Sequence, residues 1–503
     1  MFLILTLSVF ICILTVILKF SVWRAKYSQL MPGNKPKFLD ILGDAKEFFI
    51  LDNSPNKHLW QKKFFDVLRR RTEKYGRHQL FCIWLAYMPF VVIVKAEGVK
   101  EYFEKKMNKK YFLFKWMEPA LGTGLLTSEF SKWKPRRKLL MPCFHSDILQ
   151  GFLPVFNEYS QKLVDFLQEE TMKEFTLIET IVSNITLDII CDAMFGVKIE
   201  DLGNMSSEYV KSYRRFAQIF MLRFFKLWNW PDCIFKMSKE GKEMMHHLEI
   251  FHAFIRKIIQ EKKKRYLNDQ RDQNIRKRMA LLDLLLDKHI ERGELNEEDI
   301  REEVATFAVG GHETVSTAIG WVLYLIGLHR DVQTKLHEEL DKVFGEDTTR
   351  PVLKKDLSGL QYLDCVVKET LRLYPSAPIF GRETQEDTNI CGHIIPKGTS
   401  CVISTYSLHR DEDVFPDPER FDPERFSFEN SLKIPEYSYL PFSAGPRSCI
   451  GQRFAMMEIK VIISSILRNF SIESLDARDK MKPLIYITLH PSSPIRLRIR
   501  PRA

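Results

Sequence analysis

The sequence predicts a mainly α-helical protein with a small β portion, preceded by one N-terminal transmembrane helix. Three observations indicate this fold class. The first eighteen residues carry no charge and are mostly apolar. Helical periodicity dominates residues 100–350. Proline and glycine then become dense between 380 and 435, where short strands and loops are expected, and a last long helix follows Cys449.

The N-terminal segment is expected to be a membrane anchor rather than a cleaved signal peptide. No basic residue precedes the apolar run, and no small-x-small cleavage site follows it. Positive charge lies only on its C-terminal side, at Lys19, Arg24 and Lys26, so the rest of the chain should face the cytosol. We expect an anchor at 1–23, a basic and proline-containing hinge at 24–37, and one large domain at 38–503.

Composition narrows the choice of partners. The formal net charge of +10 suits an anionic membrane surface, an acidic protein partner or nucleic acid. Nucleic acid is not expected, because the chain has neither zinc-finger spacing nor an aromatic RNA-binding motif. The nine cysteines are scattered and form no C-x-x-C pair, which favours a reducing compartment over a disulfide framework.

The longest predicted helix starts near Asn296, its expected N-cap, and runs through Leu328. Two adjacent glycines, Gly310 and Gly311, lie in its middle and cost about 1 kcal/mol each. They are explained by a group that approaches the backbone, by a local opening of the helix, or by a tight helix crossing. Elsewhere, a β-hairpin is expected at 82–94 and a solvated loop at 271–278.

Two helical motifs place charges beside apolar residues. In KETLRLYP (368–375), Glu369 and Arg372 lie three apart among apolar neighbours. This spacing predicts a buried ion pair that needs a further partner, for which Arg425 is the candidate. In SKWKPRRKLL (131–140), Trp133 and Arg137 share a helix face that could hold an anion. The other basic residues there would meet an acidic partner or form a solvated surface: Lys132, Lys134, Arg136 and Lys138.

Cys449 lies in PFSAGPRSCIGQRF (441–454), between Gly445 and Gly451. A lone thiolate suits haem iron, because zinc and iron–sulfur sites need several ligands. The glycines would admit a flat macrocycle, and a helix N-terminus with nearby arginine is expected to lower the pKa of the thiol. The alternative is a buried structural cysteine. A zinc-protease motif starting at His312 is excluded, since position 316 is Ser.

Together these motifs resemble the cytochrome P450 family of haem-thiolate monooxygenases. FSAGPRSCIG (442–451) matches the haem-binding signature F-x-x-G-x-R-x-C-x-G, and GGHET (310–314) matches the oxygen-activation motif. KETLR, FDPERF and WKPRR match the E-x-x-R motif, the stretch that completes its triad, and the W-x-x-x-R motif. The resemblance covers nearly the whole chain, anchor included, and implies the cytochrome P450 fold.

The resemblance also implies a role for each matched residue. Cys449 would be the axial ligand of the haem iron, and Thr314 with Glu313 would deliver protons to bound dioxygen. The other haem contacts, including the propionate ligands, would be Trp133, Arg137, Gly310, Gly311, Arg382, His409, Phe442, Gly445, Arg447 and Gly451. Glu369, Arg372 and Arg425 would form a structural triad beneath the haem. The substrate pocket would include Phe216, Phe220, Val309, Ile379 and Leu489, with core packing as the alternative for the aromatic run 216–230.

Within the family, HRDEDVFPDPERFDPERF and RRKLLMPCFH are most similar to the family 4 fatty-acid ω-hydroxylases, of eukaryotic microsomal type. Many of those proteins carry Glu at the position of Gly310, where it can form an ester with a haem methyl group. The resemblance therefore implies haem b (iron protoporphyrin IX) held without that bond. It does not imply strict ω-selectivity.

The implied reaction inserts one oxygen atom of O₂ into a C–H bond of a lipophilic substrate. Fatty acids and related lipids are the first candidates for this substrate. Electrons would come from NADPH through NADPH–cytochrome P450 reductase, with cytochrome b5 as a second candidate partner. The implied location is the endoplasmic reticulum membrane, single-pass, with the catalytic domain facing the cytosol. Two alternatives stay open: a reductase-independent isomerase or dehydratase of lipid hydroperoxides, and a non-enzymatic membrane-tethered haem- or lipid-binding protein. The presence of both Glu313 and Thr314 argues against each.

Overall fold

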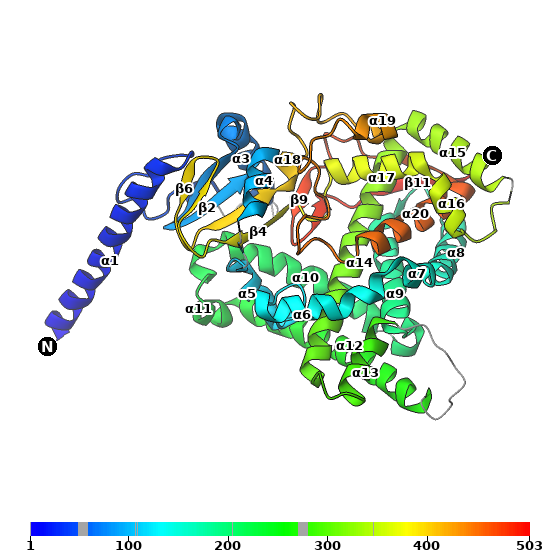
Figure 1. The fold of residues 1–503 in the computed structure, drawn as a ribbon, viewed down its shortest axis with the longest axis horizontal. Coiled ribbons are helices and arrows are strands. Elements are labelled where there is room, and N and C mark those ends of the chain that lie inside the picture. The colour runs from blue at the N-terminus through cyan, green and yellow to red at the C-terminus, as the bar shows by residue number, and fades with distance from the viewer. Residues whose placement is uncertain are drawn as a thin grey trace. The chain divides into compact units, whose positions relative to one another are not determined.

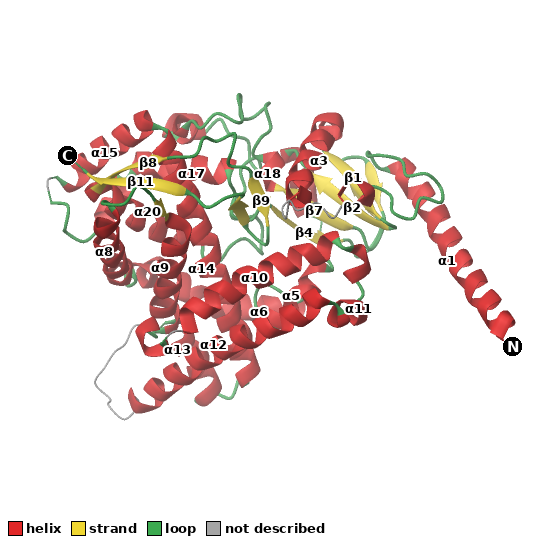
Figure 2. Ribbon diagram, turned by 180° about the vertical axis from the view of Figure 1, so that it is seen from behind, coloured by secondary structure: helices red, strands yellow, loops and turns green. Residues whose placement is uncertain are grey.

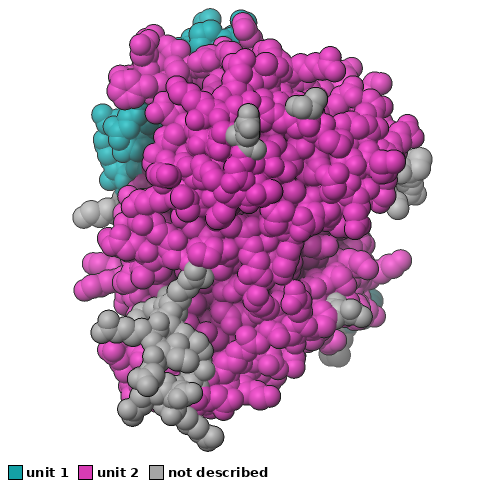
Figure 3. Space-filling model, turned by 90° about the vertical axis from the view of Figure 1, so that its right-hand side faces the viewer, with its two compact units in different colours: residues 1–113, 379–418, 434–440 teal, residues 114–378, 419–433, 441–503 magenta. Residues whose placement is uncertain are grey.

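The structure is a computed structural model that describes residues 2–48, 59–105, 107, 109–203, 205–269, 280–345 and 347–502. The loop expected at 271–278 lies outside the described residues. The chain divides into two compact units, which Figure 3 colours teal and magenta. Unit 1 consists of 1–113, 379–418 and 434–440, and unit 2 of 114–378, 419–433 and 441–503.

Unit 1 is built on a four-stranded sheet in the order β1-β2-β7-β4, drawn in yellow in Figure 2. β1 (Leu80–Leu85) and β2 (Met88–Ile93) pair as an antiparallel hairpin, which confirms the hairpin predicted at 82–94. β7 (Ser400–Ser404) runs parallel to β2, and β4 (Ile379–Glu383) runs antiparallel to β7. The other elements of the unit are α2 (Ala45–Phe48), α3 (Leu59–Tyr75), α4 (Ala96–Glu104), α18 (Thr405–Leu408), and the paired strands β5 (Thr388–Ile390) and β6 (His393–Ile395).

The N-terminal helix α1 (Phe2–Leu30) also belongs to unit 1. It is long and apolar enough to cross a membrane, with a mean hydropathy of 2.4. It continues past residue 23 and ends just before Pro32, where a proline disfavours further helix. Arg24 is only 1% exposed, because its guanidinium donates to Ala86 O at 2.9 Å and to Lys37 O at 3.2 Å. The last turns of α1 are thereby fixed to the turn of the β1–β2 hairpin.

Unit 2 is organised around α14 (Glu297–Leu328), which packs against α9 (Ile178–Ile190), α17 (Gln361–Leu373) and α20 (Gln452–Asn469). Figure 1 shows α14 passing between these elements. Asn296 caps it: its Oδ1 accepts from Asp299 N at 2.8 Å, and the Asp299 carboxylate accepts from Asn296 N at 3.1 Å. The start and end predicted for this helix are confirmed, and so is the last long helix, α20, after Cys449.

The remaining elements of unit 2 surround α14. Two small sheets occur, β3-β11-β8 and the hairpin β9-β10. The strands are β3 (Thr176–Leu177), β8 (Phe470–Ser474), β9 (Pro483–Ile485), β10 (Leu489–Pro491) and β11 (Arg496–Pro501). The helices are α5 (Leu113–Leu121), α6 (Phe130–Leu140), α7 (Ser146–Gln150), α8 (Leu153–Glu170), α10 (Met205–Phe225), α11 (Asp232–Met237), α12 (Lys239–Asp269), α13 (Leu281–Ile290), α15 (Arg330–Phe344), α16 (Lys354–Gly359) and α19 (Phe428–Ser431).

Candidate active site

Cys449 lies on a tight loop that leads into α20. Its backbone N–H donates to Phe442 O at 2.9 Å, and Ser448 N donates to Gly445 O at 3.1 Å. Gly445 has φ 68°, in the left-handed region that favours glycine, so this position of the motif needs a residue without Cβ. These bonds fix the place of the sulfur just ahead of Gly451, the N-cap of α20.

Cys449 as a residue is exposed at the surface of the loop. The protein packed around the sulfur nevertheless desolvates it and so raises the pKa of the thiol, although the Gly451 N–H and the Arg137 guanidinium act in the opposite direction. The helix end and the arginine do lower the pKa of this thiol as expected, but desolvation outweighs both, so in the protein alone the net pKa is raised. An iron ion would remove the proton on binding, since a coordinating thiol is deprotonated outright.

Two arginines hold this loop against α6. Arg137 Nη1 donates to Ser448 O at 2.9 Å, and Arg447 Nη1 donates to Ser128 O at 2.9 Å. The Arg447 guanidinium lies 4.6 Å from the ring centre of Trp133, which is buried. Trp133, Arg137 and Arg447 thus come together as the sequence predicts. Among the described residues no carboxylate forms an ion pair with Arg137, so this cation is available to an external anion.

The two glycines of α14 have different surroundings. A Cβ at Gly310 would meet no atom within 4 Å, and this residue is exposed. A Cβ at Gly311 would lie 2.8 Å from Ile190 Cγ1 of α9, and closer still to its Cδ1. Gly311 is therefore explained by a tight helix crossing, whereas Gly310 borders open space. The helix is continuous through both residues.

Thr314 and Glu313 follow these glycines. Thr314 is half-buried, and its Oγ1 donates to Gly310 O at 2.7 Å, one turn back. Ser376 Oγ donates to Thr314 O at 2.9 Å. Glu313 is buried, and its Oε1 lies 2.7 Å from His490 Nε2 and 2.9 Å from Thr488 Oγ1. Burial alone would raise the pKa of Glu313, but the charge of His490 and these hydrogen bonds lower it to about 2.

The predicted buried ion pair is confirmed, with Arg425 as its third member. Arg372 makes two hydrogen bonds to the Glu369 carboxylate, at 2.7 and 2.8 Å, and both side chains are 0% exposed. Arg425 Nε lies 3.5 Å from Glu369 Oε1. Asp422 N donates to the same oxygen at 2.9 Å. The pair therefore joins α17 to the segment around Asp422.

Three predicted haem or pocket residues belong to unit 1. Arg382 lies on β4 and donates to Gly381 O at 2.6 Å. His409 is fully buried, and its Nε2 accepts a hydrogen bond from Leu440 N at 2.8 Å, which shows that this ring supports the local backbone. Ile379 begins β4 and is half-buried.

The other predicted pocket residues lie in unit 2 and are buried. Phe216 and Phe220 pack against each other on α10, with ring centres 6.3 Å apart. Val309 lies on α14, 6% exposed. Leu489 is 0% exposed; its O accepts from Trp321 Nε1 at 2.8 Å, and its N donates to Ser376 O at 3.1 Å. Leu489 is thus part of the core, where its backbone ties β10 to α14 and to Ser376.

Two features were not predicted. His490 and Thr488, the partners of Glu313, carry no local sequence signal, because 175 residues or more separate them from Glu313. The basic residues of α6 also differ from the expectation: Arg136 is 8% exposed and pairs with Asp299 at 2.8 Å, while Lys132 pairs with Glu302 at 2.6 Å. Lys134 and Lys138 remain exposed.

These surroundings fit a haem. In the described ranges no group of three or more His, Cys, Asp or Glu could hold a metal ion, so iron at Cys449 needs further ligands from a cofactor. A porphyrin supplies them, and its carboxylates match the guanidinium of Arg137. No side chain in the described part of the chain lies within 4 Å of where a Cβ at Gly310 would stand, so a bound group could approach the backbone there.

Comparisons with known proteins agree with this site. A family model described as "Cytochrome P450" matches residues 46–498. The chain is 42% identical over 450 residues to cytochrome P450 4V2 of Mus musculus, which covers 88% of this chain and 86% of that protein. It is 38% identical over 494 residues to cytochrome P450 4c3 of Drosophila melanogaster, covering 95% of this chain and 90% of that protein. The cytochrome P450 4V2 of Homo sapiens is 42% identical over 452 residues, with coverage of 88% and 86%.

Proposed function

Because this chain belongs to the cytochrome P450 family of haem-iron monooxygenases, we propose that it hydroxylates a fatty acid or a related lipid. NADPH would supply the electrons through NADPH–cytochrome P450 reductase. The observation that carries the proposal is the exposed Cys449 just ahead of α20, together with the acid and alcohol of Glu313 and Thr314 on α14. The similarity to several family 4 proteins supports the lipid substrate.

Haem b would be held by Cys449 at its iron and by Trp133, Arg137 and Arg447 at its carboxylates. Arg382 is a further candidate from unit 1, and His409 a weaker one. When bound, the haem iron supplies the redox chemistry that activates dioxygen. The protein would position the thiolate, and its guanidinium groups would offset the negative charge of the propionates.

Thr314 and Glu313 would handle protons at the distal side. The Thr314 hydroxyl is held by Gly310 O at 2.7 Å and is half-buried, so it can exchange this partner for water. Glu313 is kept ionised by its partners, with a pKa of about 2, and so it would hold a proton only briefly before it passes the proton on. Both groups lie on consecutive residues of one rigid helix, which fixes their spacing.

The product screen that tests this function uses the full-length protein with reductase, NADPH and a panel of lipids. Mass spectrometry should find a product heavier by one oxygen atom, formed only when NADPH and reductase are both present. Turnover of a lipid hydroperoxide without NADPH, and of nothing else, would replace the proposal with an isomerase or dehydratase.

We further propose that the haem is not ester-linked, because Gly310 offers no carboxylate. Denaturation in acid organic solvent should release free haem. Gly310→Glu is the matched variant: open space surrounds the position, and the new carboxyl should retain part of the haem on the polypeptide. Haem that stays on the unaltered chain would refute this proposal.

The location and partners follow from the anchor and the surface. We propose that α1 holds the protein in the endoplasmic reticulum membrane, single-pass, with the remainder in the cytosol. Lys134, Lys138 and Arg453 are exposed and would meet an acidic reductase or, as second partner, cytochrome b5. Lys134→Glu with Lys138→Glu should raise the KM for reductase, and this effect should shrink at high salt. An unchanged KM would show that the partners dock elsewhere.

A further inference from the structure

Glu313 has a histidine partner that no motif of the chain indicates. His490 Nε2 lies 2.7 Å from Glu313 Oε1. The carboxylate side chain is 4% exposed, whereas the imidazole is 23% exposed, so His490 lies between the buried acid and water. Thr488 Oγ1 is 2.9 Å from both Glu313 Oε1 and His490 Nε2, which holds the two groups in register.

The two faces of α14 around Glu313 have different surroundings. At about 100° per residue, Gly310 and Thr314 share a face, one turn apart. Glu313, Thr317 and Gly320 share a neighbouring face, rotated from the first. The first face carries the open space beside Gly310, and the second lines a separate pocket.

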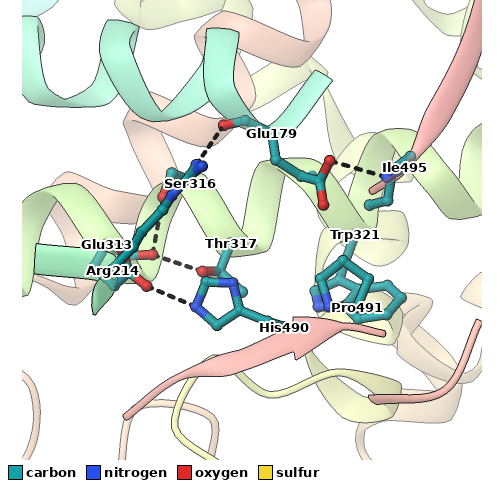
Figure 4. A pocket seen from close by; sticks show the side chains of 10 residues that line it. Glu179, Arg214, Glu313, Ser316, Thr317, Trp321, His490, Pro491 and Ile495 are labelled. Atoms are coloured by element: carbon teal, nitrogen blue, oxygen red, sulfur yellow. Dashed lines mark hydrogen bonds and ion pairs between the residues drawn. The ribbon is translucent and has the colours of Figure 1, made fainter. Parts of the chain in front are cut away.

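That pocket has charged side chains around it, although most of its wall is apolar, and it is partly open to solvent. Figure 4 shows Glu179, Arg214, Glu313 and His490 around it, with the imidazole of His490 directed from β10 towards the Glu313 carboxylate. The volume of the pocket open to the centre of a water molecule is about 20 Å³, and about 10–15 Å³ is enough to hold one water. The pocket therefore offers water a place beside His490.

We propose that His490 is a proton-transfer residue that carries protons from this pocket to Glu313. The inference rests on the proposed function, because it explains how the protons consumed in oxygen activation enter the protein. In each transfer the N–H bond at His490 Nε2 breaks and an O–H bond forms at Glu313 Oε1. Glu313 passes its proton on towards the face of Thr314. After Glu313 has passed its proton on, water in the pocket brings a proton from bulk solvent and the N–H bond at His490 Nε2 forms again.

The other charged groups near His490 do not provide this path. His312 is fully buried and bonded to Ser183 Oγ at 2.8 Å, and burial lowers its pKa to about 4. Glu179 accepts from Ile495 N at 2.9 Å, and burial raises its pKa. The Arg214 guanidinium has only N–H donors and no acceptor atom. The ring of Tyr486 packs against His490 at 5.3 Å, which limits how far the imidazole can turn.

The test replaces His490 by Gln, which keeps a hydrogen-bond donor near Glu313 but cannot titrate. The matched control is His247→Gln, on α12, because His247 also lies beside a carboxylate, Glu243, at 3.9 Å. Product per NADPH is measured from pH 6 to 8.5, together with hydrogen peroxide. In the wild type and the control, product per NADPH should fall as pH rises. In His490→Gln, product per NADPH should be several-fold lower at pH 6 and should not change with pH. A pH profile in His490→Gln that matches the wild type would overturn the proposal.

A second measurement does not depend on turnover. Thermal midpoints of His490→Gln, Glu313→Gln and the double variant form a cycle at pH 7. The double variant should lose less than the sum of the two single losses, because each single variant already breaks the same pair. Additive losses would contradict the pairing and with it the proton path. If the wild type yields no product with any lipid, the proposed function fails, and the cycle still decides whether His490 and Glu313 act as a unit.

Discussion

Gly311 allows a sharp test of how α14 is packed. Replacing glycine by alanine within a helix gains about 1 kcal/mol of intrinsic propensity. At Gly311 the new Cβ would lie 2.8 Å from Ile190 Cγ1, while carbon atoms in good contact are about 3.5–4.0 Å apart. Ile190 is 2% exposed and β-branched, so it cannot simply turn away. Such overpacking costs about 1–3 kcal/mol, which leaves Gly311→Ala neutral to about 2 kcal/mol less stable.

Gly320 on the same helix is the matched control. Its added Cβ would lie 3.8 Å from Ile495 Cδ1 and 4.0 Å from Glu179 Cγ, which is ordinary contact. Gly320→Ala should therefore keep the full gain of about 1 kcal/mol. The two variants should differ by about 1–3 kcal/mol. Because unfolding entropy is about 2.1 cal/mol/K per residue, 1 kcal/mol corresponds to about 1 °C in this chain.

The assay is the thermal midpoint of the haem-loaded protein in one detergent, followed by circular dichroism. Ile190→Val removes Cδ1, the nearest atom to the new methyl group, and should cost about 0.5–1.5 kcal/mol in the wild type but little or nothing beside Gly311→Ala. Equal midpoints for Gly311→Ala and Gly320→Ala, or no rescue by Ile190→Val, would refute the crossing as the reason for Gly311.

Further predictions concern the site and its support. Cys449→Ser should abolish the thiolate-type Soret shift of the reduced CO complex, and a retained shift would refute the ligand assignment. Thr314→Ala should divert electrons to peroxide, seen as less product per NADPH; an unchanged ratio would count against its role. Glu369→Ala leaves the fully buried Arg372 without its carboxylate partner, so the free energy of unfolding should fall by about 3–5 kcal/mol. A thermal midpoint equal to that of the wild type would disprove this. The depressed pKa of Glu313, about 2 against an ordinary 4.5, stabilises the fold above pH 4.5 by about 3 kcal/mol. This contribution of Glu313 to the free energy of unfolding should be lost as pH falls towards 2. In Glu313→Gln, a pH series of thermal midpoints should no longer show the corresponding fall.

Local chemistry explains what the sequence could predict. The capping pair Asn296–Asp299 and the apolar periodicity behind it determine α14, and both are visible in consecutive residues. Glu369 and Arg372 also lie close in the sequence, and their apolar neighbours predict a buried pair. Interactions within a few residues leave a pattern in the sequence.

Contacts between residues far apart in the chain explain what the sequence could not predict. His490 lies in a short strand, and only the β9–β10 hairpin brings it to Glu313. Arg136 was expected to face outward, but the N-terminal turns of α14 supply Asp299 and Glu303 to it. The direction of the Cys449 pKa depends on how much protein surrounds the sulfur, which spacing does not show.

The buried Arg24 has a mechanical consequence. Its bonds to Ala86 O and Lys37 O, and the 3.0 Å bond between Ser21 Oγ and Tyr87 Oη, join the end of α1 to the β1–β2 turn. Because the end of α1 is bonded to this turn, a change in the tilt of α1 in the bilayer would also reorient the β1–β2 hairpin. Bilayer thickness, which sets the tilt of a spanning helix, would then orient this hairpin and the sheet it belongs to at the membrane surface. Truncations that aim at a soluble protein should for the same reason stop before Ser21.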